Sequence, residues 1–245
     1  MLRTYWQASR APRYSLLFAL PLLIIYQTLA VLVPPGPGGV GIRNGADVLL
    51  QAVFVSIAGP WGPPLFMVCL IAVGAWLIAK DLRANRGTFS PAVVGGMLLE
   101  SVCLSLVFGI VVGGLTAALL GAPPPPMAIG LTPERLGRST LLMLSIGAGI
   151  YEELLFRVVL VGLLAWGAKQ LLGWRPLYAG IAATILGALI FSAFHYIGPY
   201  GDPPEVYSFV FRTLAGLFFS ALYLLRGFGI TAWTHALYDV FLLLR

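Results

Sequence analysis

Residues 91–119 read PAVVGGMLLESVCLSLVFGIVVGGLTAAL, a run with one charged side chain, that of Glu100. An α-helix needs about 20 apolar residues to cross the hydrocarbon core of a bilayer. The run exceeds this length, so it predicts a transmembrane helix. The whole chain has the same character: 59% of its residues are hydrophobic, 10% are charged, and its mean hydropathy is +0.93. This composition favours an integral membrane protein over a soluble globular domain.

Other apolar runs of spanning length occur along the chain. The short stretch ADVLLQAVFVSIA at 46–58 is open to three interpretations: an interfacial helix, a re-entrant segment or an additional span. We therefore expect an all-α fold, a polytopic transmembrane helical bundle with seven or eight spans, in which residues 1–245 form one membrane domain. The further runs of spanning length lie at 15–33, 62–79, 139–165, 177–196, 206–225 and 228–244.

Segments rich in proline and glycine separate several of these runs. Proline removes a helical hydrogen bond and clashes with the preceding turn, so these segments should end helices. They are PPGPGG at 34–39, GPWGPP at 59–64, APPPP at 122–126 and GPYGDPP at 198–204.

The net charge of +6 comes from basic residues that lie in short clusters beside the apolar runs. The clusters fall at 3–13, 80–86, 169–175 and Arg226, and the positive-inside rule then places the N-terminus in the cytoplasm. Basic clusters at these places are typical of contacts with anionic lipid, so we expect no nucleic acid as a partner. The N-terminal run is interpreted as an uncleaved span, in the inner membrane of a bacterial or archaeal cell.

Ionisable residues inside spans are costly, by at least about 2.5 to 3.5 kcal/mol each at the bilayer centre, and they usually mark polar interiors with a function. The run at 139–165 contains YEELLFR, in which Glu153 and Arg157 are four residues apart on one helix face, and Glu152 points about 100° away. One glutamate can pair with the arginine while the other faces a cavity. A purely structural ion-pair cluster is the alternative.

The only two histidines of the chain lie in two other spans. Phe191 and His195 are four residues apart in FSAFH, and His235 and Asp239 are four apart in HALYD. A short connection at 166–176 should bring the spans of Glu152 and His195 together. A glutamate base assisted by a histidine can activate water. His235, oriented by Asp239, can donate a hydrogen bond to the oxyanion of a tetrahedral intermediate.

The three motifs EExxxR, FxxxH and HxxxD, in this order on separate spans, resemble those of the CPBP family of intramembrane glutamic proteases. That family includes CaaX prenyl endopeptidases and bacteriocin-processing or self-immunity proteins. The resemblance implies a catalytic core at about 139–245 and a metal-independent peptide hydrolase without a cofactor. Asp239 departs from the asparagine of the prenyl endopeptidases. The resemblance makes Glu152, His195, His235 and Asp239 catalytic, with Glu153, Arg157 and Phe191 in support.

The substrate implied is a membrane-associated or exported protein, cut at a CaaX-like C-terminus, a leader peptide or a C-terminal sorting segment. Two other functions stay open. Glu152, His195 and His235 could form the three-ligand site of a zinc hydrolase, although the HExxH signature is missing. The same polar residues could serve a non-proteolytic transporter, immunity protein or scaffold. Glu100 and Arg212 match no motif and are interpreted as structural or interfacial.

Overall fold

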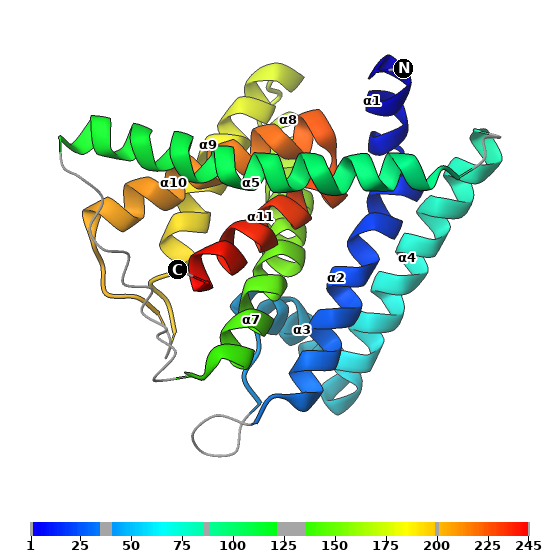
Figure 1. Cartoon of the computed structure of the whole chain (residues 1–245), viewed down its shortest axis with the longest axis horizontal. Coiled ribbons are helices and arrows are strands. Elements are labelled where there is room, and N and C mark those ends of the chain that lie inside the picture. The colour runs from blue at the N-terminus through cyan, green and yellow to red at the C-terminus, as the bar shows by residue number, and fades with distance from the viewer. Residues whose placement is uncertain (1, 35–40, 86–88, 122–135, 199–200, 245) are drawn as a thin grey trace.

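The computed structural model describes residues 2–34, 41–85, 89–121, 136–198 and 201–244, and all regular structure in these ranges is helical (Figure 1). The expectation of an all-α bundle is therefore confirmed. The helices in chain order are α1 (Leu2–Arg10), α2 (Pro12–Leu32), α3 (Gly45–Ala58), the 3₁₀ turn η2 (Gly59–Trp61), α4 (Gly62–Ala84), α5 (Pro91–Leu120), α7 (Arg138–Gly147), the π-helix η3 (Ala148–Leu160), α8 (Val161–Leu171), α9 (Pro176–Phe194), α10 (Val206–Arg226) and α11 (Phe228–Leu243).

Five helical segments of the described ranges are long and apolar enough to cross a membrane. They are α2, the segment Gly45–Ala84, α5, α9 and α10. This finding confirms a polytopic membrane protein. Two further helical rods complete the bundle: α7, η3 and α8 follow one another without interruption, and α11 has 16 residues. If both rods also cross the bilayer, and Gly45–Ala84 crosses it once, the described chain makes seven crossings.

The short apolar stretch at 46–58 forms α3, which does not have the length of a span. Its 14 residues measure about 21 Å at 1.5 Å per residue, less than the roughly 30 Å of a bilayer core. The chain turns at Gly59, where φ is +55°, and α4 then packs against α3. A Cβ atom at Gly62 would lie 2.4 Å from the backbone nitrogen of Val55, so this close return requires glycine. Helix α3 is therefore a folded-back arm of α4.

The proline-rich break at 59–64 behaves differently in its two halves. Gly59–Trp61 ends α3, as expected, but Pro63 and Pro64 lie in the first turn of α4. Proline is tolerated there because the first backbone N–H groups of a helix have no partner within the helix. The breaks predicted at 35–39 and 122–126 lie outside the described residues.

Helix α11 lies at the centre of the bundle, in contact with α2, α5, α7, η3 and α10 (Figure 1). Small residues allow these approaches. A Cβ atom at Gly229 would lie 2.3 Å from the backbone oxygen of Ser15, and the hydroxyl groups of Thr231 and Thr234 donate to carbonyls four residues earlier in the chain. His235 is therefore carried into the interior by a helix of which no residue is exposed.

The N-terminal helix α1 was not among the expected elements. It is held to the bundle by a polar cluster around Glu100 and Arg226. Arg226 forms an ion pair with Glu100, at 2.5 Å between Nε and Oε1, and donates to Ser9. Tyr5 donates to the other Glu100 oxygen at 2.5 Å, and the Arg226 guanidinium lies 3.8 Å from the ring centroid of Trp6. Glu100 thus has the structural role that its isolation from the motifs suggested.

Candidate active site

The fourth apolar run contains a π-helix in place of the ordinary α-helix that its spacing suggested. The π-helix η3 covers Ala148–Leu160 and carries Glu152, Glu153 and Arg157. Such wide turns are rare in proteins and are frequent at functional sites. The helix is brought close to α11 by Gly149, since a Cβ atom there would lie 2.4 Å from the backbone oxygen of Ala232. Both acidic side chains are therefore buried near the centre of the bundle.

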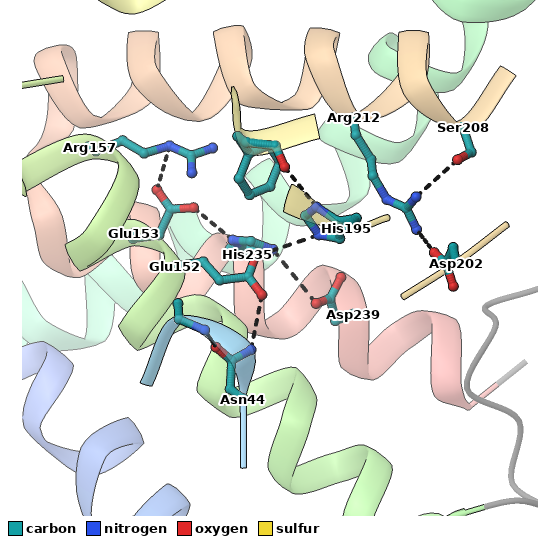
Figure 2. A network of polar contacts seen from close by, with 12 residues as sticks. Asn44, Glu152, Glu153, Arg157, His195, Asp202, Ser208, Arg212, His235 and Asp239 are labelled. Atoms are coloured by element: carbon teal, nitrogen blue, oxygen red, sulfur yellow. Dashed lines mark hydrogen bonds and ion pairs between the residues drawn. The ribbon is translucent and has the colours of Figure 1, made fainter. Parts of the chain in front are cut away.

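Glu153 connects two of the three motifs. Its side chain is fully buried, Oε2 lies 3.1 Å from Arg157 Nε, and Oε1 lies 2.7 Å from His235 Nδ1 (Figure 2). The pairing with Arg157 is the one that the sequence spacing predicted. The contact with His235 joins η3 to α11 across 82 positions in sequence, and it was not anticipated.

Aromatic rings enclose the cationic partner of Glu153. The Arg157 guanidinium carbon lies 4.4 Å from the Phe191 ring centroid and 5.6 Å from that of Phe219. The His235 ring stacks on Phe219, with centroids 4.5 Å apart and planes 17° from parallel. These faces attract the cation by their quadrupoles and limit ring rotation. Glu153, Arg157 and His235 therefore form one closely packed unit.

Glu152 turns away from this unit and has different partners. Its Oε1 accepts a hydrogen bond from Asn44 Nδ2 at 2.9 Å. Its Oε2 is buried without a hydrogen-bond partner in the described chain and lies 3.8 Å from His195 Nε2. The His195 side chain is 24% exposed, against 9% for that of Glu152. The two adjacent glutamates thus differ in their surroundings. Glu153 is enclosed and paired, whereas Glu152 has one oxygen without a hydrogen bond beside the more exposed His195.

His195 directly follows the last residue of α9. Its Nδ1 lies 2.8 Å from the backbone oxygen of Phe191. A carbonyl oxygen can only accept, so we assign the Nδ1 proton to this hydrogen bond. In the neutral ring, Nε2 then presents a lone pair on the side of Glu152. Phe191 also makes an edge contact with the His195 ring, at 4.9 Å between centroids, so it touches both the histidine and Arg157.

Asp239 lies near His235 but makes no hydrogen bond to it. The distance between His235 Nε2 and Asp239 Oδ2 is 3.7 Å, longer than a hydrogen bond. The sequence suggested that Asp239 orients the imidazole, whereas the hydrogen bond of this ring is the one that Nδ1 donates to Glu153 on η3. The spacing within one helix revealed Asp239 as a neighbour of His235. It could not reveal Glu153, which lies on another helix.

Arg212 lies at the edge of the same group of side chains (Figure 2). It forms an ion pair with Asp202 and donates to Ser208 at 2.9 Å, and its guanidinium faces the Tyr196 ring at 5.5 Å. These contacts join α10 to the segment that follows His195. Arg212 is therefore a structural residue, as expected, with a partner beyond its own helix.

Asn44 is the site residue that sequence reasoning missed. It lies more than 100 positions before Glu152 and caps the N-terminus of α3. A cap signal was present, because asparagine stands before the apolar run and Asp47 follows three residues later. The signal predicts where the helix begins, but it does not reveal the distant carboxylate that the asparagine also contacts.

In the described ranges, no group of three or more His, Cys, Asp or Glu side chains is arranged to hold a metal ion. Glu152, His195 and His235, the three ligands suggested for zinc, do not point to one common position. Glu152 lies beside His195, and His235 points its Nδ1 to Glu153.

Comparison with protein families matches residues 136–241 to the family model described as type II CAAX prenyl endopeptidase, Rce1-like. Comparisons with curated proteins and with solved structures gave no significant match. The matched region begins just before α7, ends within α11, and contains all three motifs. Residues 136–241 are therefore similar to the CAAX-type membrane endopeptidases of the CPBP family, the family that the three motifs resemble.

Proposed function

We propose that the chain is an intramembrane endopeptidase of the glutamic type, in which Glu152 and His195 activate the attacking water. The observation that carries this proposal is the free oxygen of Glu152. Oε2 is buried, has no hydrogen-bond partner in the described chain, and lies 3.8 Å from the Nε2 atom of His195. A buried carboxylate oxygen normally has a partner, so an unpaired one beside an imidazole lone pair suits a water that donates to both.

The reaction then proceeds by general base catalysis. Glu152 takes a proton from the water as the water oxygen bonds to the peptide carbonyl carbon, and the carbonyl π electrons move to the oxygen. The C–N bond breaks when this tetrahedral intermediate collapses, and the proton held by Glu152 passes to the leaving nitrogen. His195, fixed by its Nδ1 contact with Phe191, orients the water during both steps.

The oxyanion is stabilised by His235. Its Nδ1 donates to Glu153, so Nε2 can donate to the oxyanion when the ring carries both protons. Asp239, 3.7 Å from Nε2, contributes negative charge on that side of the ring. Glu153 and Arg157 act indirectly, because they hold His235 in one orientation.

The family description supports a C-terminal CAAX segment, membrane-bound through its prenyl group, as the substrate class. A leader peptide or a C-terminal sorting segment would be cut by the same chemistry. The substrate class therefore rests on the family match, and the reaction rests on the side chains.

The proposal is tested by comparing cells that carry wild type, Glu152→Gln or His195→Ala at equal expression. Intact-mass analysis of the membrane and secreted proteomes should reveal a protein that accumulates uncut in both variants. Glu205→Gln is the control, since Glu205 is exposed and precedes α10. Identical termini in all strains would contradict a protease.

A second assay uses the purified protein and an internally quenched farnesylated CaaX peptide. We expect wild type to cleave it and Glu152→Gln to lose at least about 100-fold in rate, within the range typical of a lost general base. Cleavage that is abolished by a chelator and restored by zinc would instead support the zinc hydrolase.

A further inference from the structure

We infer that Asn44, in the N-terminal half of the chain, is a positioning residue that holds the catalytic base Glu152; this inference rests on the proposed function. Asn44 is buried, and its Nδ2 donates to Glu152 Oε1 at 2.9 Å. It makes the only hydrogen bond to the Glu152 carboxylate that the described residues supply. The contact comes from outside residues 136–241, so it is no part of the region that the family model matches.

The orientation of the Asn44 amide is set by the helix that it caps. Its Oδ1 accepts from the backbone N–H of Ala46 at 2.9 Å, so the NH₂ end must face the glutamate. Its own backbone N–H donates to the Tyr26 hydroxyl at 3.1 Å. The asparagine is thus held at three points, and the same side chain starts α3 and orients the carboxylate.

A buried polar network supports Asn44 from α2 and α3. Asp47 is fully buried and accepts from Tyr26 at 2.8 Å, from Arg43 at 2.9 Å and from Gln51 at 2.6 Å. Removing any one donor would leave the buried charge less well compensated. This network fixes the start of α3, and with it the distance from Asn44 to Glu152.

Two consequences for Glu152 follow from this contact. Because Asn44 occupies Oε1, the oxygen left to accept a proton is Oε2, which lies on the side of His195. The donated hydrogen bond also favours the ionised carboxylate, the form that acts as a base. The other charged or titratable groups that act on Glu152 are Arg157 on its own helix, His195 after α9, and His235 and Asp239 on α11.

The test is Asn44→Asp, which keeps an oxygen to cap α3 but places a carboxylate against Glu152. Two adjacent carboxylates do not readily remain ionised together, so one of them should stay protonated at neutral pH. We expect kcat on the farnesylated peptide to fall about 10- to 100-fold at pH 7, with KM within about twofold. We also expect part of the loss to be recovered at higher pH.

The matched control is Asn85→Asp. Asn85 Nδ2 donates to Asp81 Oδ1 at 2.8 Å, so the substitution creates the same pair of carboxylates at the end of α4. Its pH profile should be that of wild type. Asn44→Ser, which keeps a capping oxygen but is too short to reach Glu152, should lose kcat without the recovery at high pH. Thermal unfolding of each purified variant verifies that it is folded.

Infrared titration separates this inference from the proposed function. The carboxyl band of Glu152, identified by subtracting the spectrum of Glu152→Gln, should persist to higher pH in Asn44→Asp than in wild type. An unchanged band, or an unchanged pH profile of kcat, would overturn the role of Asn44. Cleavage that persists in Glu152→Gln would overturn the proposed function, even if the band moves.

Discussion

Two adjacent glutamates of one helix have opposite surroundings. Glu153 is enclosed, with an ion pair to Arg157 and a contact to His235, whereas Glu152 has one oxygen held by Asn44 and the other beside the more exposed His195. The same chemical group can therefore serve stability at one position and chemistry at the next. Exchanging each for glutamine should separate the two effects.

Glu153→Gln should lower the free energy of unfolding by about 3–5 kcal/mol, because it leaves the buried Arg157 without its counter-ion. Glu152→Gln should change stability much less, since an amide oxygen can still accept from Asn44. Thermal unfolding in detergent, measured alongside peptide cleavage, gives both quantities. We expect both variants to lose cleavage and only Glu153→Gln to lose stability. Equal melting temperatures would contradict this division of roles.

At the scale of elements, the π-helix η3 determines how the motifs meet. Its register directs Glu153 toward α11 while Glu152 faces α3 and His195. The close approach of η3 to α11 depends on Gly149, where a Cβ atom would also lie 2.7 Å from the Cβ atom of Ala236. The separation of these two helices thus controls the contact between Glu153 and His235.

Gly149→Ala should force η3 and α11 apart, lowering the free energy of unfolding by about 1–3 kcal/mol and reducing cleavage. The control is Gly162→Ala in α8, where a Cβ atom would meet open space, and a change from no effect to about 1 kcal/mol of stabilisation is expected. Unfolding and peptide cleavage are measured on both. Equal free energies of unfolding and equal cleavage rates in the two variants would show that a side chain at position 149 does not push η3 away from α11.

At the scale of the whole molecule, the number of crossings determines the orientation of the site, and seven crossings result if α11 and the rod of α7, η3 and α8 span the bilayer beside the five candidate spans. If the N-terminus is cytoplasmic, as the positive-inside rule predicts, the basic residues at the ends of α4, α8 and α10 would all lie on the cytoplasmic side. Residues 201–205, which precede α10, would then lie outside the cell. This orientation would give a substrate access to His195 from the external side.

The orientation can be tested by labelling Pro203→Cys in intact cells with a membrane-impermeant maleimide, after replacing the native Cys69 and Cys103. Pro203 is exposed in the segment after α9, so labelling from outside is expected. An exposed position at the other end of α9, Trp174→Cys, should be labelled only after the membrane is permeabilised. The reverse pattern would place the site opening on the cytoplasmic side.

The sequence predicted most of the helices but only part of the site. The apolar runs agree with the observed helices to within a few residues, because the bilayer demands a minimum length and proline and glycine mark the ends. The pairing of Glu153 with Arg157 followed from spacing along one helix. The contacts of Glu153 with His235 and of Asn44 with Glu152 join distant segments, and no local pattern encodes such partners. The π-helix was missed because its sequence also suits an α-helix.

The central position of α11 has a consequence for how the protein is made. This helix follows every other described helix in the chain, yet it fills the space between α2, α5, α7, η3 and α10 and brings in His235. Because the chain is made from its N-terminus, Glu153 has no His235 to contact until α11 has been synthesised and has joined the bundle. The proposed site is therefore complete only after α11 is in place, so its assembly is a late event in the making of the protein.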